Sequence, residues 1–300
     1  MNIDLKSSLI YLARHGSHAY GLNTPESDLD TKGVLIPPVD YIHGLFVVEQ
    51  VENSKDIPGN DSVVYEIRKF FRLAADCNPN IIEVLFCDDS DILISTKVGE
   101  KLRENRELFL SRKAKHTFSG YAFSQLKRIK AHKKWLLDPP KAKPCRSDFG
   151  LPEELKVINN EAFSSEVMTA AIVHEKQYAE ALARWDQYQN WRNTRNPKRA
   201  ELEAKFGFDC KNATHLIRLS RMCLEILSGK GVIVKRPDAE ELLSIRKGAW
   251  TYDQVMEYAE SSEKEAEKLY VTSTLPYKPD MGRLNKLCIE LIEEHLMRGP

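Results

Sequence analysis

The chain has 300 residues, of which 42% are hydrophobic and 29% are charged, and its 44 Lys and Arg balance 44 Asp and Glu. This balance excludes a uniformly basic nucleic-acid-coating protein but not a local basic face. No run approaches the roughly 18 apolar residues of a membrane span, and the N-terminal apolar run is too short for a signal peptide. The six cysteines are scattered without a CxxC pair. We therefore expect reduced thiols, no metal–cysteine site and a cytoplasmic location.

The first hundred residues contain short apolar runs typical of strands. Three such runs occupy residues 7–14, 28–36 and 61–67, and the third leads directly into a helical pattern at 68–76. Residues 78–86 begin with Asn-Pro, a start signal for a helix or strand.

Beyond residue 111 the strand patterns disappear. A Pro-rich connection occupies 138–154, and helical patterns occupy 119–137, 165–193, 212–231, 251–270 and 281–297. Strands followed by helices predict an α+β fold. We expect a catalytic palm domain over 1–110 and a helical domain over 111–300.

One segment combines glycine, serine and two acidic residues, in HGSHAYGLNTPESDLDTKGV over 15–34. Asp28 and Asp30 occupy alternate positions, so on a strand they share one face. Two neighbouring carboxylates favour a bound cation, and Mg²⁺ prefers such oxygens together with substrate phosphates. Gly16 lets a phosphate approach the backbone, and Ser17 offers a hydroxyl and an N–H. Alone, the motif also fits a turn before an Asp-capped strand.

Gly-Ser, ten residues and then Asp-x-Asp resembles the signature of the DNA polymerase β-type nucleotidyltransferase superfamily. Further segments resemble its RNA-ligase-associated (RlaP-like, or YcgL-type) predicted members: YEIRKFFRLAADCNPNIIEVLF, GYAFSQLKRI, HKKWLL, HLIRLSRM, RPDAEELLSIR and SSEKEAE. The resemblance implies the superfamily fold, Mg²⁺ or Mn²⁺, an NTP donor and a hydroxyl acceptor. It leaves the acceptor open.

The superfamily pattern also requires a third carboxylate on a later strand. Asp61 and Glu66 are the candidates, and their spacing places them on opposite faces of a regular strand. We favour Asp61, which lies on the strand itself, with Glu66 as the fallback. Asp28, Asp30 and Asp61 are thus the predicted catalytic and metal-binding residues, and Gly16 and Ser17 the predicted phosphate-binding residues.

The helix near residue 212 presents a polar face that includes Lys211, His215 and Arg218. A solvated surface is the ordinary interpretation of such a face. Superfamily members commonly close the nucleotide cleft with a helical domain that supplies basic side chains. The resemblance therefore predicts that Lys211 and Arg218 bind the triphosphate or the acceptor phosphate, with His215 beside them.

Two segments interleave basic and aromatic residues, at 125–137 and 185–199. Stacking rings beside basic groups are typical of single-stranded nucleic acid binding. The same pattern fits amphipathic helices with their rings in a core, and we favour that interpretation.

Together these features predict a divalent-metal-dependent nucleotidyltransferase that moves an NMP from an NTP to a hydroxyl and releases pyrophosphate. An RNA or DNA end is the favoured acceptor. The alternatives are a protein acceptor, as in nucleotidylylating (AMPylating) antitoxin-like enzymes, and a nucleotide-sensing module without turnover.

Overall fold

The computed structural model describes residues 3–153 and 165–297, and the side chains within these ranges except those of 165–168 and 198. Two compact units emerge from the contacts along the chain. The first combines residues 1–127 with 210–300, and the second comprises 128–209. The sequence predicted a boundary near residue 110 between a catalytic and a helical domain, because the strand patterns end there. That boundary between functional domains stays a prediction.

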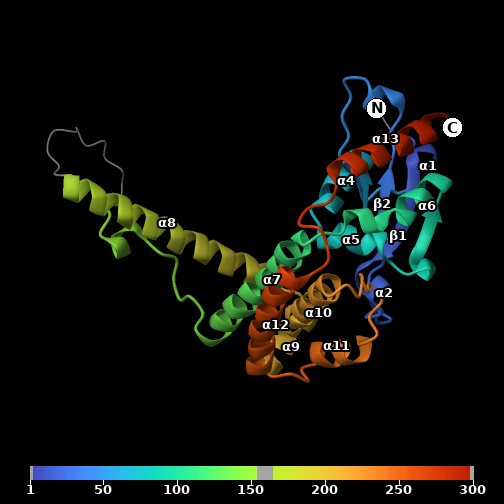
Figure 1. The fold of residues 1–300 in the computed structure, drawn as a ribbon. Helices are drawn as coiled ribbons and strands as arrows, with labels where there is room; N and C mark the ends of the chain where they lie inside the picture. The colour runs from blue at the N-terminus through green and yellow to red at the C-terminus, as the bar shows by residue number, and fades with distance from the viewer. Residues whose placement is uncertain (1–2, 154–164, 298–300) are drawn as a thin grey trace. The chain divides into compact units, whose positions relative to one another are not determined.

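The first unit is built on a five-stranded mixed sheet with strand order β3-β4-β2-β1-β5 (Figure 1). β1 pairs antiparallel with both β2 and β5, β2 pairs parallel with β4, and β3 covers the outer edge of β4. The strands are β1 (Leu9–His15), β2 (Asp30–Leu35), β3 (Gln50–Glu52), β4 (Asp61–Glu66) and β5 (Ile92–Ser95).

The central strands are apolar because helices cover the sheet. Ile10, Leu12, Val34 and Val64 are fully buried, whereas the edge strand β3 is partly exposed. Helices α4 (Ile67–Ala75), α5 (Pro79–Leu85) and α6 (Lys97–Glu104) contact the strands. Shorter helices are α1 (Leu5–Ser8), α2 (Gly16–Tyr20) and α3 (Val39–Ile42), with 3₁₀ turns η1 (Asp89–Asp91) and η2 (Arg106–Phe109).

The later part of the first unit is helical. It contains α10 (Cys210–Leu227), α11 (Ala239–Arg246), α12 (Tyr252–Thr272) and α13 (Met281–Met297). α10 packs against α11 and α12, and α13 packs against α4 and α6. Lys101 of α6 forms ion pairs with Glu290 and Glu294 of α13 at 3.5 and 3.4 Å. The final helix therefore belongs to the same compact unit as the sheet.

The second unit contains the end of α7 (Lys113–Leu137), the turn η3 (Arg146–Phe149), α8 (Ser165–Thr194) and α9 (Pro197–Phe206). Asn196 caps α9 by accepting from the Arg199 N–H, and Pro197 occupies its first turn. Among the described helices, none is both long and apolar enough to cross a bilayer.

The α+β fold predicted from the sequence is confirmed by the mixed sheet and the helices that follow it. One detail differs: β2 begins at Asp30, so Asp28 precedes the strand by two residues. Helices α6, α9 and α11 were not predicted, because each has only eight to ten residues and offers a weak periodic signal.

Candidate active site

The predicted acidic residues meet where three neighbouring strands begin or end. β1 finishes at His15, which lies opposite Asp30 in the antiparallel register. Asp30, the first residue of β2, lies opposite Asp61, the first residue of β4. The register thus places His15, Asp30 and Asp61 side by side at one end of these strands, which we call the acidic edge of the sheet.

Gly16 follows directly after β1 and lies against Asp30. Its φ of +65° belongs to the left-handed region, and a Cβ at this position would overlap the Oδ2 of Asp30. Ser17 comes next, partly exposed in the first turn of α2. A side chain at position 16 would therefore block the approach of a ligand to the Asp30 carboxylate.

Asp28 is held near this edge by its neighbours in the chain. The Leu29 N–H donates to the Oδ1 of Asn60 at 3.0 Å, and the Asn60 N–H donates to the Leu29 carbonyl at 2.7 Å. This pair of bonds ties the segment before β2 to the segment before β4. Asp28 is exposed, and it lies close enough to Asp30 for its charge to raise the pKa of that carboxyl.

Negative charge accumulates at the edge. Burial, followed by the charges of Asp61 and Asp28, raises the pKa of Asp30. Within the described residues no ion pair with Lys or Arg reaches any of these three carboxylates. The carboxylates therefore repel one another, and a cation from solution would relieve that repulsion.

Glu66, the fallback third carboxylate, lies at the other end of β4, opposite Leu35 rather than Asp30. Five residues of strand place it about 16 Å from Asp61 along the chain. It is buried, accepts from the Lys69 N–H at 3.1 Å as the N-cap of α4, and pairs with Arg68 at 2.7 Å. The structure therefore does not bring Glu66 to Asp28 and Asp30.

A buried polar cluster lies next to the acidic edge. Glu83 of α5 pairs with Arg218 of α10 at 2.5 Å and accepts from the Tyr20 hydroxyl at 2.5 Å. The Arg218 guanidinium lies 3.8 Å from the centre of the Tyr20 ring. Burial alone would raise the pKa of Glu83, but the charge of Arg218 holds it below its ordinary value.

The same cluster keeps basic groups close to the acidic residues. His15 lies 3.9 Å from Glu83, and burial together with the charge of Lys32 lowers its pKa to about 3. Lys32 follows Asp30 by two positions on β2. Burial lowers the pKa of Lys32, while the charges of Glu83, Asp61 and Asp30 act in the opposite direction. At neutral pH His15 is thus a neutral imidazole.

The three residues predicted on α10 have different surroundings. Arg218 is only 4% exposed and engaged with Glu83, so it would bind phosphate only after that pair opens. Burial, followed by the charges of Arg218 and Lys211, lowers the pKa of His215 to about 3. Lys211 is exposed at the start of the helix. Their nucleotide-binding role stays a prediction.

Lys32, Glu83 and Tyr20 were not predicted from the sequence. Lys32 could have been predicted as a neighbour of Asp30, because a spacing of two residues places both side chains on one face of β2. Glu83 offered only a weaker signal, as an acidic residue within the apolar run NIIEVLF. Its partner Arg218 is 135 residues away, so no local pattern indicates the pair.

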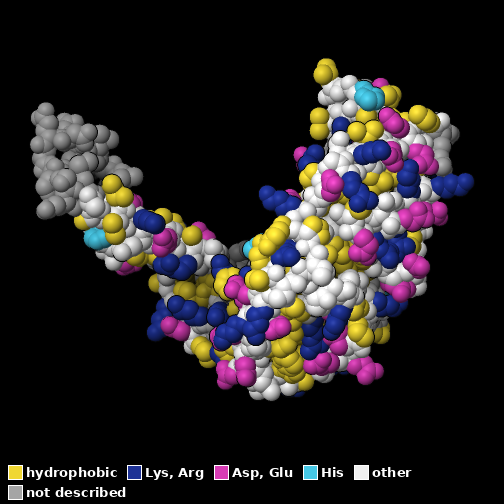
Figure 2. Space-filling view, viewed as in Figure 1, with side chains coloured by type: hydrophobic (Ala, Val, Ile, Leu, Met, Phe, Trp, Pro, Cys, Tyr) yellow, Lys and Arg dark blue, Asp and Glu magenta, His cyan; other side chains and the backbone are white. Residues whose placement is uncertain are grey.

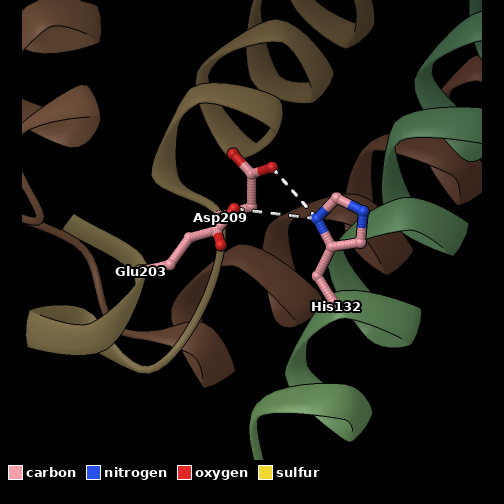
Figure 3. Close-up of side chains that lie close together, drawn as sticks. All are labelled: His132, Glu203 and Asp209. Carbon is pink, nitrogen blue, oxygen red and sulfur yellow. Dashed lines mark ion pairs between the residues drawn. The ribbon is translucent and has the colours of Figure 1, made fainter. Parts of the chain in front are cut away.

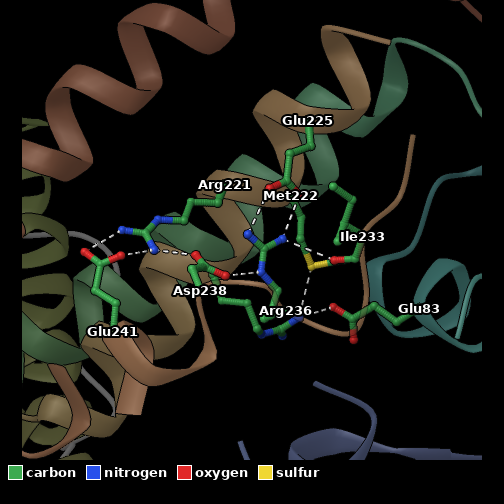
Figure 4. Close-up of polar contacts among 9 residues, drawn as sticks. Glu83, Arg221, Met222, Glu225, Ile233, Arg236, Asp238 and Glu241 are labelled. Atoms are coloured by element: carbon green, nitrogen blue, oxygen red, sulfur yellow. Dashed lines mark hydrogen bonds and ion pairs between the residues drawn. The ribbon is translucent and has the colours of Figure 1, made fainter. Parts of the chain in front are cut away.

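A second network of ion pairs ties α10 to α11 and to the segment before it (Figure 4). Arg236 pairs with Glu225 at 2.7 Å and with Asp238 at 2.7 Å, and its backbone N–H donates to the Tyr20 carbonyl at 3.1 Å. Arg221 pairs with Asp238 and, at 2.7 Å, with Glu241. Tyr20, next to the acidic edge, is thus tied to the helices through both its backbone and its hydroxyl.

A separate acidic cluster lies in the second unit, where the imidazole of His132 points from α7 toward two carboxylates (Figure 3). His132 Nδ1 lies 3.3 Å from Asp209 and 3.7 Å from Glu203. Arg195 pairs with Glu203 at 2.5 Å, and Arg199 pairs with Asp209. Because two arginines already balance the two carboxylates, this group has less need of a metal ion than the edge of the sheet.

Comparison with known proteins supports the assignment of the N-terminal region. Residues 2–139 match the model of the RlaP family, described as the RNA repair pathway DNA polymerase beta family. An Enterobacteria phage T4 protein, described as an uncharacterized 38.9 kDa protein in the nrdC-mobD intergenic region, is 25% identical over 284 residues, covering 82% of this chain and 84% of that protein. No solved structure shows significant similarity to the chain.

The family match confirms the resemblance seen in the Gly-Ser and Asp-x-Asp motif, and it includes the whole acidic edge of the sheet. Over residues 2–139, just under half of its length, the chain is thus similar to the RlaP family, the RNA repair pathway DNA polymerase beta family.

Proposed function

We propose that the protein transfers an NMP from an NTP to the hydroxyl of a nucleic acid end, with release of pyrophosphate. The observation that carries this proposal is the register that sets Asp30 beside Asp61, with Gly16 packed against Asp30. The hydrogen bonds between Leu29 and Asn60 join the segment that contains Asp28 to the start of β4. The similarity to a family described as belonging to an RNA repair pathway supports a nucleic acid acceptor.

The three carboxylates fit a divalent metal ion such as Mg²⁺ or Mn²⁺. They are oxygen ligands, and no ion pair in the described part of the chain balances their charge. When bound, such an ion supplies charge stabilisation for the transferred phosphoryl group. Asp28, Asp30 and Asp61 are the residues that would hold it.

The reaction then proceeds by displacement at the α-phosphorus. The acceptor hydroxyl oxygen forms a bond to the α-phosphorus, the bond to the β-phosphate oxygen breaks, and pyrophosphate leaves. Asp61, exposed at the start of β4, takes the proton of the hydroxyl. Ser17 and the backbone at Gly16 hold the β- and γ-phosphates by hydrogen bonds.

Incubation with α-³²P-labelled NTPs tests the proposal directly. Each of the four NTPs is supplied with Mg²⁺ or Mn²⁺ and with RNA, DNA or lysate protein in separate reactions. We expect the label to appear in a nucleic acid fraction, together with an equal amount of pyrophosphate.

The outcomes separate the alternatives. Label in protein alone would overturn the nucleic acid acceptor and favour nucleotidylylation of protein. NTP binding without pyrophosphate release in any reaction would overturn the enzyme and favour a nucleotide-sensing module. The Asp28→Asn/Asp30→Asn protein serves as the negative control in each reaction.

A further inference from the structure

Lys32 lies two residues after Asp30 on β2 and takes no part in the reaction proposed above. Exposed basic residues are common in this protein, and Figure 2 shows Lys and Arg side chains spread among acidic ones over the surface that it draws. Lys32 is different, because it is half-buried and, within the described residues, forms no hydrogen bond and no ion pair. It therefore lacks the partner that usually accompanies an enclosed charge.

The register of the sheet fixes the face on which Lys32 lies. Lys32 and Asp30 occupy alternate positions of β2, so their side chains share one face. On one side of β2, the antiparallel register sets Ala13 of β1 opposite Lys32 and His15 opposite Asp30. On the other side, Asp61 of β4 lies opposite Asp30. Because residues opposite each other on neighbouring strands share a face, this whole row lies on the same face as Lys32.

Helix α5 covers this face of the sheet. Tyr11 lies on the same face of β1 as His15, and its hydroxyl donates to the Val84 carbonyl of α5 at 3.1 Å. Glu83, the preceding residue of α5, lies 3.9 Å from His15 at the end of the same strand. The Lys32 side chain therefore extends from the sheet toward α5, beside the acidic edge.

Three carboxylates surround the Lys32 ammonium without pairing with it. Burial lowers the pKa of Lys32, and the charges of Glu83, Asp61 and Asp30 oppose that effect. Among the described residues none of the three forms an ion pair with Lys32, and Glu83 instead pairs with Arg218 at 2.5 Å. The ammonium is thus available to a further anion that enters the acidic edge.

We propose that Lys32 is a further catalytic residue, whose ammonium donates a hydrogen bond to a non-bridging oxygen of the α-phosphate of the NTP. The inference rests on the proposed function, because it names a group that contacts the transferred phosphoryl. In that reaction the α-phosphate lies beside Asp30 and Asp61, the residues that Lys32 adjoins, whereas Gly16 and Ser17 follow β1. No proton moves in this contact. The ammonium stabilises the negative charge of the phosphoryl oxygens in the transition state.

Lys32→Met tests this contact, because it removes the charge and keeps an unbranched side chain. The full-length protein is assayed with α-³²P-NTP at saturating NTP and Mg²⁺, and we expect kcat to fall by about a hundredfold. Titration calorimetry with the α,β-methylene analogues of the NTPs, which cannot release pyrophosphate, measures binding without turnover. In this measurement, with Mg²⁺ present, we expect Kd to rise about tenfold.

Lys278→Met is the matched control. Lys278 belongs to the first unit, is exposed, and likewise forms no ion pair within the part of the chain that the structure describes. Its substitution should leave kcat and Kd unchanged. Lys32→Gln is a second variant without the charge, should show the same losses as Lys32→Met, and serves in its place if the methionine protein does not fold. Circular dichroism spectra show whether each variant is folded.

A cation that only offset the carboxylates would act differently from a catalytic one. Lys32→Met would then bind Mg²⁺ more tightly, while kcat at saturating Mg²⁺ and NTP and Kd for the analogue would stay within about threefold of wild type. That result would overturn the inference and leave the proposed function intact. Absence of transfer by the wild type to every acceptor would overturn the proposed function. The analogue then decides the contact alone: a raised Kd in Lys32→Met supports it, and an unchanged Kd overturns it.

Discussion

Two groups of acidic side chains in this molecule have opposite surroundings. Asp28, Asp30 and Asp61 lie together at the edge of the sheet, and the pKa of Asp30 is raised by burial and by its acidic neighbours. Glu203 and Asp209 are more deeply buried but each has an arginine partner. A charge-balanced cluster serves stability, whereas an unbalanced one leaves a demand for an external cation.

The largest expected effect comes from removing a carboxylate of the sheet edge. Asp30→Asn should reduce NMP transfer by about a hundredfold or more, because a catalytic metal contributes several kcal/mol and each 1.4 kcal/mol is a factor of ten. Transfer of label from α-³²P-NTP measures the effect. Asp56→Asn, at an exposed position between β3 and β4, is the control. Wild-type activity in the Asp28→Asn/Asp30→Asn protein would contradict the proposal that the carboxylates of the sheet edge are needed for NMP transfer.

Asp61→Asn and Glu66→Gln should have unequal effects, because only Asp61 lies beside Asp30. We expect the Asp61 variant to lose transfer to a similar extent as Asp30→Asn. Glu66→Gln should retain transfer and lose about 1 kcal/mol of stability, since Glu66 caps α4. Steady-state rates and urea unfolding separate the two. Equal tolerance of both substitutions would place the third carboxylate elsewhere.

Glu203→Gln tests the balanced cluster. It removes the carboxylate that Arg195 contacts, and breaking a buried pair costs about 3 kcal/mol of unfolding free energy. The matched control is Glu201→Gln, an exposed position on the same helix α9, which should change stability by less than about 0.5 kcal/mol. Mg²⁺-dependent stability that disappears in the Glu203 variant would contradict the contrast between the two clusters.

Ser17→Ala should weaken NTP binding, since a hydrogen bond to a charged group contributes about 1.5–3 kcal/mol, or roughly ten- to a hundredfold in Kd. Titration calorimetry with NTP and Mg²⁺ measures it, and metal binding alone should change little. Ser27→Ala is the control, because its hydroxyl is occupied by Thr24 in the turn before β2. Unchanged NTP affinity would make Ser17 a turn residue only.

Local patterns were sufficient to predict much of the fold and part of the site. The Gly-Ser turn, the strand with Asp30 and the long helices each depend on residues close in sequence. The sequence already favoured Asp61 over Glu66, but the parallel pairing of β2 and β4 from their first residues, which sets Asp61 beside Asp30, could not be predicted from local patterns. The Glu83–Arg218 pair depends on packing of α10 against α5, which no local periodicity indicates.

The smallest effect concerns stability without metal. The pKa of Asp30 is raised above 3.8 in the folded protein, so ionisation of this carboxyl destabilises the fold. This destabilisation is absent below the pKa of the unfolded state and is complete once the pH exceeds the pKa of the folded state. Asp30→Asn should therefore stabilise the protein in EDTA at neutral pH. Asp30 is partly exposed to solvent, so screening limits the gain to about 0.5 kcal/mol.

The gain should shrink as the pH falls below about 4, where the wild-type carboxyl is protonated. Added Mg²⁺ should make the wild type more stable than the variant, because Mg²⁺ binding to the folded state stabilises the wild type and not the variant. Melting temperatures at pH 4 and 7, with EDTA or Mg²⁺, provide the four measurements. A variant that is less stable than the wild type in EDTA at pH 7 would mean that Asp30 is already paired with a protein cation, and the contrast with Glu203 and Asp209 would then fail.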